Sequence, residues 1–301
     1  MPIRILSLPD KDLRYALDCM GVDVLIALSI CSKRTKKLVK SSNRKIHRHI
    51  VHLDENYTCF DICESERVFQ PKTDRIYFNV YYTWAVLDQG NGLEVWIKNE
   101  FTQSDWIAHF LSIFNEPTIP VLVIENVSLS YLDSVTQFIP KVRILNISER
   151  CSNGLTRKAF LKLAPIARFV QVANYSSEND ISQFLSLNLR DLDFYDGENP
   201  FKVTSVDLLA VNIEDLSIEY ANITERELNR FLKLWMKRNH TFYRPKSIRL
   251  TLEDEEIELN HQEVFKGVQY QTVDHKLRLK RGDGKELTFF VEEDVIVFEF
   301  T

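Results

Sequence analysis

Apolar and polar residues alternate with helical spacing through the first forty positions of the chain. Leu13, Leu17 and Met20 recur at i, i+4 and i+7 and therefore define one face of a helix, which Gly21 ends. The apolar run at residues 24–30 predicts a second short helix, and Ser32 can cap a third whose basic residues point outward. Three helices of this size bury little surface by themselves, so we expect the unit to dock on another surface.

Two later segments have the residue content and the alternation of β-hairpins. The first, at about residues 66–99, is rich in Tyr, Phe, Val and Ile and contains a Gly-Asn-Gly turn at 90–92. The second, at about residues 268–300, alternates with period two on both sides of a Gly-Asp-Gly turn at 282–284. Helices are indicated elsewhere by a Thr followed three residues later by an acidic residue, at Thr102 and Thr224.

Between these hairpins a short apolar pattern, apolar-x-x-apolar-x-apolar, recurs six times and is followed by polar turns and amphipathic segments. Its central residues are 122, 145, 170, 192, 216 and 248, so the steps are 23, 25, 22, 24 and 32 residues. Leucine-rich repeats have periods of about 20–29 residues, and terminal repeats are often atypical. The pattern predicts a strand–helix solenoid like a leucine-rich repeat, although another α/β layer with the same alternation would fit it too.

Stacked repeats present alternate strand residues on one extended face, which is the usual binding face of such proteins. Here that face is mostly acidic, so we hypothesise that it binds a basic patch on a partner. The alternative is that the strands keep polar residues outward for solubility alone. The candidate target-binding residues are Asp191, Asp193, Tyr195, Asp215, Ser217, Glu219 and Arg249.

Charge is distributed unevenly along the 301 residues, whose net charge is −5. The first fifty residues contain eleven Lys and Arg against four acids, a net charge of +7, and the remainder therefore carries −12. A chain divided in this way can address two different partners. The basic run at 32–48 has no interleaved aromatic residue, so nucleic acid is not an expected partner; the run suits a solvated helix face or attraction to an acidic protein.

Neither a membrane span nor a secretory leader is expected. No apolar run approaches the roughly 18 residues that a spanning helix needs, and Pro9 and Asp10 interrupt the N-terminal apolar stretch. The five cysteines are odd in number and irregular in spacing, which indicates free thiols in a reducing compartment, the cytoplasm or the nucleus.

No set of residues predicts catalysis, a cofactor or a metal. Cys59 and Cys63 lack a second ligand pair at zinc spacing, and His47, His49 and His52 lie among basic residues that repel a cation. Nucleophile elbows and glycine-rich nucleotide loops are absent from the sequence. We therefore expect a protein that is not an enzyme and holds no metal or cofactor.

Residues 6–40 resemble the F-box that is greatly expanded in nematodes. The resemblance rests on a Leu-x-Leu-Pro start followed by apolar and basic residues at characteristic positions: Leu6, Leu8, Pro9, Leu13, Leu17, Met20, Leu25, Ile26, Leu28, Ser29, Cys31, Ser32, Arg34 and Leu38. In that family the F-box docks on a small acidic Skp-type adaptor, and through it on a cullin. The resemblance implies adaptor contacts at Leu6, Leu8, Pro9, Leu13, Leu17, Leu25, Leu28, Ser32 and Arg34.

A second resemblance, to the type 2 F-box-associated domain, covers much of the rest. It rests on the helix Leu228 to Lys237, on Trp106-Ile107-x-His109, and on the Asp283-Gly284-Lys285 turn. In the family this domain recognises other proteins. We therefore expect an F-box domain at 1–48 and an F-box-associated, repeat-like recognition domain at 49–301, in a mixed α+β or α/β protein.

Together the resemblances imply the substrate-recognition subunit of a cullin-based, SCF-type ubiquitin ligase. Its F-box would bind the Skp-type adaptor, and its C-terminal domain would bind an unidentified target protein. The alternative is an interaction scaffold that holds proteins without promoting their degradation.

Overall fold

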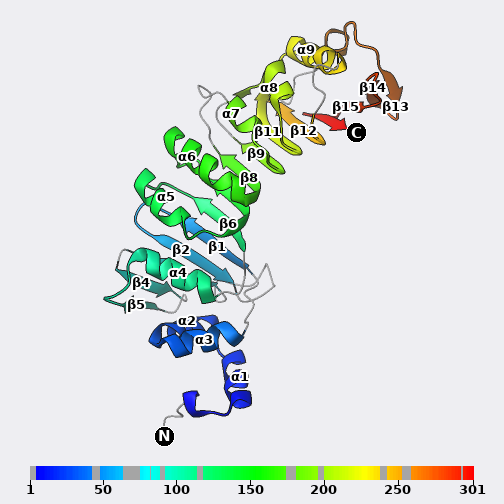
Figure 1. Ribbon diagram of the computed structural model, residues 1–301. Coiled ribbons are helices and arrows are strands. Elements are labelled where there is room, and N and C mark those ends of the chain that lie inside the picture. Colours follow the sequence, from blue (N-terminus) through cyan, green and yellow to red (C-terminus); the bar gives the residue numbers. More distant parts are fainter. Residues whose placement is uncertain are drawn as a thin grey trace. The chain divides into compact units, whose positions relative to one another are not determined.

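The computed structural model describes residues 5–42, 48–63, 75–81, 83–88, 92–113, 118–173, 181–195, 200–237, 243–252, 259–292 and 294–301 (Figure 1). The chain forms two compact units, Met1–Arg143 and Ile144–Thr301. Residue 48, where the sequence suggests a boundary between domains, lies inside the first unit, and that boundary stays a prediction. Helices at the N-terminus are followed by a large region made mostly of sheet, so the expected mixture of helix and strand is confirmed.

The first unit begins with the predicted helices. A 3-10 turn, η1 (Ile5–Ser7), precedes α1 (Asp10–Asp18), α2 (Val22–Cys31) and α3 (Lys33–Ser42). Pro9 and Gly21 occupy the caps before α1 and α2, where proline costs nothing because the amide would have no helical partner. Ser32 caps α3 as expected, because its Oγ accepts the Thr35 amide at 3.1 Å while Thr35 Oγ1 accepts the Ser32 amide at 2.9 Å.

The sheet of the first unit has the strand order β6-β1-β2-β3-β4-β5. Its strands are β1 (Arg48–Leu53), β2 (Thr58–Cys63), β3 (Arg75–Val80), β4 (Trp84–Asp88), β5 (Leu93–Ile97) and β6 (Thr118–Ile124). Neighbouring strands run antiparallel except β1 and β6, which are parallel. The predicted hairpin is thus confirmed as β3, β4 and β5, while residues 66–74 of its predicted range and the turn at 89–91 lie outside the described residues.

Helix α4 (Gln103–Ile113) supplies much of the core of this unit, and α5 (Leu129–Thr136) follows β6. Phe110 of α4 lies 4.0 Å from Phe60 and 4.8 Å from Phe78, measured between ring centroids, and all three rings are buried. The predicted cap is present, since Asp105 Oδ2 accepts the Thr102 amide at 2.9 Å. Stacked aromatic pairs of this kind add about 1 kcal/mol each to the burial of their area.

The second unit alternates strands and helices. After β7 (Lys141–Ile147), which crosses the division between the units, come α6 (Asn153–Leu163), η3 (Ala164–Ile166), β8 (Ala167–Ala173), α7 (Ser182–Leu185), β9 (Asp191–Tyr195), β10 (Phe201–Lys202), α8 (Ser205–Ala210), β11 (Asp215–Asn222), α9 (Glu225–Met236) and β12 (Ser247–Leu252). Strands β8, β9, β11 and β12 are parallel neighbours in chain order. The central residues of all six predicted strand cores are buried: Leu122, Leu145, Val170, Leu192, Leu216 and Ile248.

Antiparallel strands complete the second unit. After α10 (His261–Val264) come β13 (Gln271–Val273), β14 (Lys276–Lys280), β15 (Glu286–Glu292) and β16 (Val295–Phe300), and β16 pairs with β12. The predicted terminal hairpin is therefore confirmed. Its turn is fixed by the buried Arg281, whose Nε donates to Asp283 Oδ1 at 2.9 Å and whose Nη1 donates to the Trp235 carbonyl at the end of α9.

Candidate functional site

Apolar side chains remain exposed on the helical unit at the N-terminus. Leu6 is 36% exposed, Val24 46% and Tyr15 73%, and Pro9 is exposed as well. Tyr15 and Val24 are missing from the adaptor contacts that the sequence implies. They could have been found from helical periodicity, because Tyr15 lies on the face of α1 opposite Leu13 and Leu17.

The nine implied adaptor contacts fall into two groups. Leu13, Leu17 and Leu25 are 5% exposed or less, so they hold the three helices together. The other six reach the surface in part or fully: Leu6, Leu8, Pro9, Leu28, Ser32 and Arg34. The hydroxyl of Ser32 is already engaged in the cap of α3. An exposed apolar front supported by a buried apolar layer is what a docking surface of this size requires.

Hydrogen bonds from α4 and from the segment after β5 link these helices to the rest of the first unit. The His109 ring on α4 lies 2.9 Å from the Ser29 hydroxyl on α2, measured from Nε2 to Oγ. Because Ser29 donates its only proton to the Ile26 carbonyl at 2.6 Å, Nε2 of His109 must be the donor. Lys98 Nζ donates to the Ile30 carbonyl at 3.0 Å, near the end of α2, where the helix dipole favours a cation.

The environment of His109 keeps its ring neutral. Burial lowers its pKa from 6.5 to about 4, and the positive charges of Lys36 and Lys98 act in the same direction. A protonated ring would bring a third cation among buried apolar groups. The junction between α2 and α4 is therefore built for a neutral histidine that carries its proton on Nε2.

The seven candidate target-binding residues meet on neighbouring parallel strands of the second unit. Asp191 of β9 is paired in register with Asp215 of β11, and Asp193 with Ser217. Ser217 is in turn opposite Arg249 of β12. Side chains at matching register lie on one face of a parallel sheet, so the predicted clustering of these residues is a feature of the fold.

This acidic strand face has a shallow groove of about 600 Å³, to which Asp191, Asp193, Asp215 and Arg249 contribute. Burial raises the pKa of Asp191, and the neighbouring Asp215 raises it further. Burial also raises the pKa of Asp193, while hydrogen bonds with Gln171 and Ser217 act in the opposite direction. Oδ2 of Asp193 accepts the hydrogen bond from Gln171 Nε2 at 3.3 Å. The other oxygen, Oδ1, is buried and has no hydrogen-bond partner among the described residues. Arg190 Nε lies 3.7 Å from Asp191 Oδ2 and partly offsets the repulsion from Asp215, and a donor from outside would stabilise the carboxylates further.

The remaining candidates lie at the carboxyl end of the same strands. Tyr195 is 41% exposed, and its ring centroid lies 6.4 Å from that of Tyr220. Tyr220 has a φ of 58°, and the register of β11 against β12 shifts between Ile218 and Ala221. The irregularity exposes the Tyr220 ring beside Glu219, whose pKa is raised by burial and by Asp193. Tyr220 is therefore a surface aromatic that the strand pattern did not predict.

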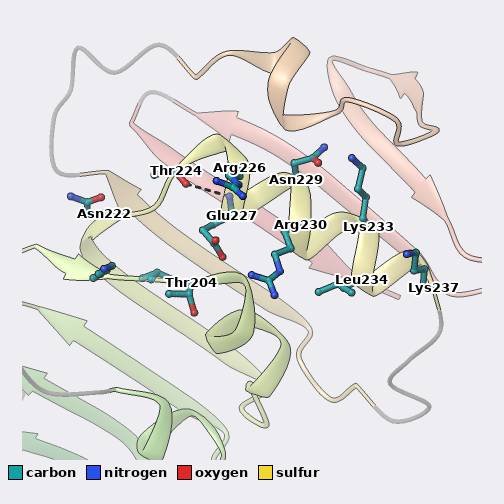
Figure 2. Close-up of a pocket in the computed structure, with 12 residues that line it drawn as sticks. Thr204, Asn222, Thr224, Arg226, Glu227, Asn229, Arg230, Lys233, Leu234 and Lys237 are labelled. Carbon is teal, nitrogen blue, oxygen red and sulfur yellow. Dashed lines mark hydrogen bonds between the residues drawn. The ribbon is translucent and has the colours of Figure 1, made fainter.

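A second concavity lies beside α9, and it has the opposite charge. Figure 2 shows Arg226, Arg230, Lys233 and Lys237 along this helix, with Lys202 of β10 among the further lining residues. The volume is about 830 Å³. The opposite, buried face of the helix is made of Leu228, Phe231, Leu232 and Trp235.

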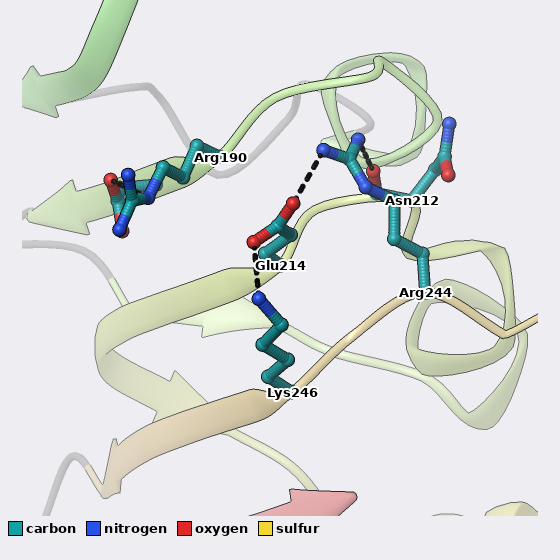
Figure 3. Close-up of polar contacts among 6 residues, drawn as sticks. Arg190, Asn212, Glu214, Arg244 and Lys246 are labelled. Atoms are coloured by element: carbon teal, nitrogen blue, oxygen red, sulfur yellow. Dashed lines mark hydrogen bonds and ion pairs between the residues drawn. The ribbon is translucent and has the colours of Figure 1, made fainter. Parts of the chain in front are cut away.

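One ion-pair cluster fixes the start of β12 beside the acidic strand face. Glu214 accepts from Lys246 Nζ at 2.8 Å and from Arg244 Nη2 at 3.0 Å, as Figure 3 shows. Arg244 Nη1 also donates to the Asn212 carbonyl at 3.1 Å. These hydrogen bonds lower the pKa of Glu214 to about 2, so the cluster stays charged at any physiological pH. It anchors the segment that leads into β12 and so positions Arg249.

Comparison with known proteins finds two domain families in the chain. The F-box domain family matches residues 5–47, and the F-box associated family matches residues 180–241. The chain therefore contains an F-box and an F-box-associated domain. It is 26% identical over 253 residues to the F-box associated domain-containing protein sdz-33 of Caenorhabditis elegans, which covers 79% of this chain and 75% of that protein. No solved structure matches the chain.

Together an F-box and an F-box-associated domain indicate a substrate-adaptor role in SCF-type ubiquitin ligases, and F-box domains in general bind the Skp-type adaptor. Proteins of both families are adaptors rather than enzymes. The F-box-associated match includes β9, β11 and α9, so it contains most of the acidic strand face and the concavity beside α9.

Within the part of the chain that the structure describes, no three His, Cys, Asp or Glu side chains are grouped as a metal site. His49 is buried, His52 lies 4.0 Å from Glu125, and His47 falls outside the described residues. Burial and Asp61 raise the pKa of Cys59 to about 12, so its thiol stays protonated and is a poor nucleophile. Among the described residues no helix is long and apolar enough to cross a membrane.

Proposed function

We propose that this F-box protein is the substrate-recognition subunit of a cullin-based, SCF-type ubiquitin ligase. The F-box binds a Skp-type adaptor and through it a cullin, while the F-box-associated domain binds a target protein. Holding the target near the ligase raises the effective concentration of its lysines at the site of ubiquitin transfer. The chain's own contribution is binding and positioning, without covalent chemistry.

The observation that carries the proposal is the exposed apolar front of the F-box. Leu6, Pro9, Tyr15 and Val24 expose apolar surface, and Leu8 and Leu28 are partly accessible beside them. Fully burying a side chain such as leucine is worth roughly 1.5–3 kcal/mol. The basic residues of α3, among them Arg34, add electrostatic attraction to an acidic adaptor, which speeds association more than it adds affinity.

Capture of the target is assigned to the acidic strand face. Asp191, Asp193 and Asp215 carry the carboxylates of this face, and Asp193 Oδ1 has no hydrogen-bond partner among the described residues. Tyr195 gives an aromatic contact at the end of the same strands. Ser217, Glu219 and Arg249 complete the face. Its chemistry suits a basic, hydrogen-bond-donating patch on a folded partner.

Three further assignments belong to the same proposal. The strand–helix succession of the second unit is a short solenoid of the leucine-rich-repeat type, with the acidic strand face as its binding surface. The F-box occupies residues 1–48 and the recognition domain residues 49–301. The protein acts in the cytoplasm or the nucleus, where its five free thiols remain reduced.

A pull-down with purified Skp-type adaptor tests the F-box assignment. Leu6→Asp combined with Tyr15→Asp should reduce adaptor binding at least 100-fold, since roughly 3 kcal/mol of apolar burial is lost. Both side chains are exposed, so the circular dichroism spectrum should not change. Leu161→Asp, at an exposed leucine on α6, is the matched control and should bind normally. Undiminished binding by the double variant would contradict the proposed docking surface.

Affinity capture from cells, with and without a proteasome inhibitor, tests the ligase role. A target should accumulate on the protein when the proteasome is inhibited, and its half-life should lengthen when the gene product is removed. Adaptor binding without a change in the half-life of any captured protein would favour a non-degradative scaffold instead.

A further inference from the structure

Helix α9 has a basic stripe on the side that faces away from the core. Arg226, Arg230, Lys233 and Lys237 recur at i, i+4, i+7 and i+11, so they lie within one narrow sector of the helix. The apolar residues of α9 are buried on the opposite side. Arg226, Arg230 and Lys237 are exposed, whereas Lys233 is half-buried, and the end of its side chain, Cε and Nζ, lies close to Gly267.

The stripe borders a hollow rather than a convex helix surface. The strand end at Lys202, the turn at Thr204 and the end of β11 at Asn222 form the other wall. In Figure 2 Arg230 points from α9 toward the segment that carries Thr204. We call these residues together the α9 groove. Solvation of a helix face would account for the exposed cations of α9. It does not account for a second wall that carries a fifth cation, Lys202.

Among the described residues, the positive charge of the α9 groove is neutralised only in small part, by Glu227 beside Arg226 and Arg230. None of its five cations takes part in an ion pair between described residues: Lys202, Arg226, Arg230, Lys233 and Lys237. The lining includes one carboxylate, Glu227, and that group accepts the Ser205 amide at 2.7 Å. The bond from Ser205 lowers the pKa of Glu227, so it is charged, but it stands alone against five cations.

We propose that the α9 groove binds an extended, acidic peptide segment of a partner protein. Residues 226 to 237 rise by about 16 Å along the helix axis, which roughly five residues of extended chain would span. Alternate side chains of such a chain are about 6.6 Å apart, close to the rise of about 6 Å between helix positions four apart. Acidic residues at every second position of the peptide therefore match the stripe.

A peptide fits this groove better than a nucleic acid does. Single strands are bound through bases stacked on aromatic side chains together with basic contacts. The residues that line the groove include no aromatic side chain. Phosphorylated or carboxylate side chains both satisfy the groove's charge, because arginine binds either group through two parallel hydrogen bonds.

Fluorescence anisotropy on the purified full chain tests the proposal. The probe is a labelled nine-residue peptide of alternating glutamate and glycine, compared with a glutamine–glycine peptide of equal length. The acidic peptide should bind at least tenfold more tightly at 50 mM salt. A phosphoserine–glycine peptide distinguishes phosphate from carboxylate recognition. Whichever of the two acidic peptides binds more tightly shows which acidic group the groove prefers.

Charge reversal separates the groove from general electrostatics. Arg226→Glu combined with Arg230→Glu should weaken the acidic peptide at least tenfold. Arg143→Glu combined with Arg157→Glu changes the net charge equally at exposed arginines outside the groove, and it should change binding less than twofold. Equal loss in both double variants, or no preference for the acidic peptide, would overturn the proposal. Tighter binding of a single-stranded oligonucleotide than of the peptide would overturn it as well. Adaptor binding through the F-box is not involved in either measurement.

Discussion

The junction between the F-box helices and the sheet that follows should respond to mild acid through one residue. His109 on α4 donates from Nε2 to Ser29 on α2, and its pKa is lowered from 6.5 to about 4 by burial and by the charges of Lys36 and Lys98. Replacing His109 with Gln removes the titrating group but keeps an amide that can donate to Ser29. The variant should therefore lose a pH dependence that the natural chain has.

The sign and size of the effect follow from the two pKa values. Below pH 6.5 the unfolded chain binds a proton at His109, whereas the folded chain resists protonation until about pH 4. The free energy of unfolding thus falls as the pH drops from about 6.5 toward 4. Between pH 7 and pH 5 the difference is at most about 2 kcal/mol, since one pKa unit corresponds to about 1.4 kcal/mol. Burial is the main cause of the shift, so salt should change the effect little, and we expect a loss of about 1–2 kcal/mol.

Urea unfolding at pH 7, 6 and 5 measures the effect, with the natural chain and His109→Gln compared at each pH. The difference in unfolding free energy between the two should shrink or reverse by about 1–2 kcal/mol as the pH falls, because the natural chain alone loses this contribution. Ser29→Ala serves as a second arm: it leaves Nε2–H without a buried acceptor and should cost about 1–3 kcal/mol at pH 7. Parallel pH profiles for the natural chain and the Gln variant would refute the neutral, buried histidine.

Three further changes test other parts of the structure. Asp191→Asn combined with Asp215→Asn removes two like charges that are paired in register, so the melting temperature should stay equal or rise slightly. Capture of a basic target should weaken, and unchanged capture would contradict the assignment of the acidic strand face. Asp283→Asn leaves the buried guanidinium of Arg281 with a weaker partner, and the melting temperature measured by circular dichroism should fall, whereas an unchanged value would show that the pair is not needed. In Tyr131→Phe, the buried side chains of Thr58 and Gln103 lose the hydroxyl with which both form hydrogen bonds. The free energy of unfolding measured in urea should fall by about 1–3 kcal/mol, with no change in adaptor binding.

The strand cores and the terminal hairpin could be predicted from the sequence because their signals are local. The apolar triplets around Leu122, Leu192 and Ile248 have the alternation that a half-buried strand requires, and each central residue is buried. The pairing of strands is different. That β6 lies beside β1 rather than beside the nearer β5 depends on contacts between residues some seventy positions apart, which no local pattern contains.

The candidate site could be predicted in part from the sequence, because strand alternation is a local pattern, whereas contacts between distant elements are not. Placing Asp191, Asp193 and Asp215 on one face required only strand alternation and the step of 24 residues between the two strands. The distinction between Leu17 in the core and Tyr15 at the surface is likewise available from helical periodicity, since the two residues lie on opposite faces of α1. The α9 groove was missed because its second wall, from Lys202 to Asn222, is set by the packing of β10 on β11, and only α9's own stripe is visible in the sequence.

Two surfaces of opposite charge in one recognition domain impose a stricter requirement on a target than either alone. A basic protein is attracted to the acidic strand face but repelled by the five cations of the α9 groove, and an acidic protein meets the reverse. A target with a basic patch and a separate acidic segment satisfies both, and once one contact forms the second becomes intramolecular. If each contact alone discriminates tenfold, a target that engages both gains about a hundredfold over one that engages neither. Removing or reversing the charge of either surface should therefore relax selectivity as well as weaken binding. The Asp191→Asn, Asp215→Asn variant should retain proteins with acidic segments, and the charge-reversed Arg226→Glu, Arg230→Glu variant should retain basic ones. Loss of all captured proteins in either variant would mean that the two surfaces recognise a single continuous epitope.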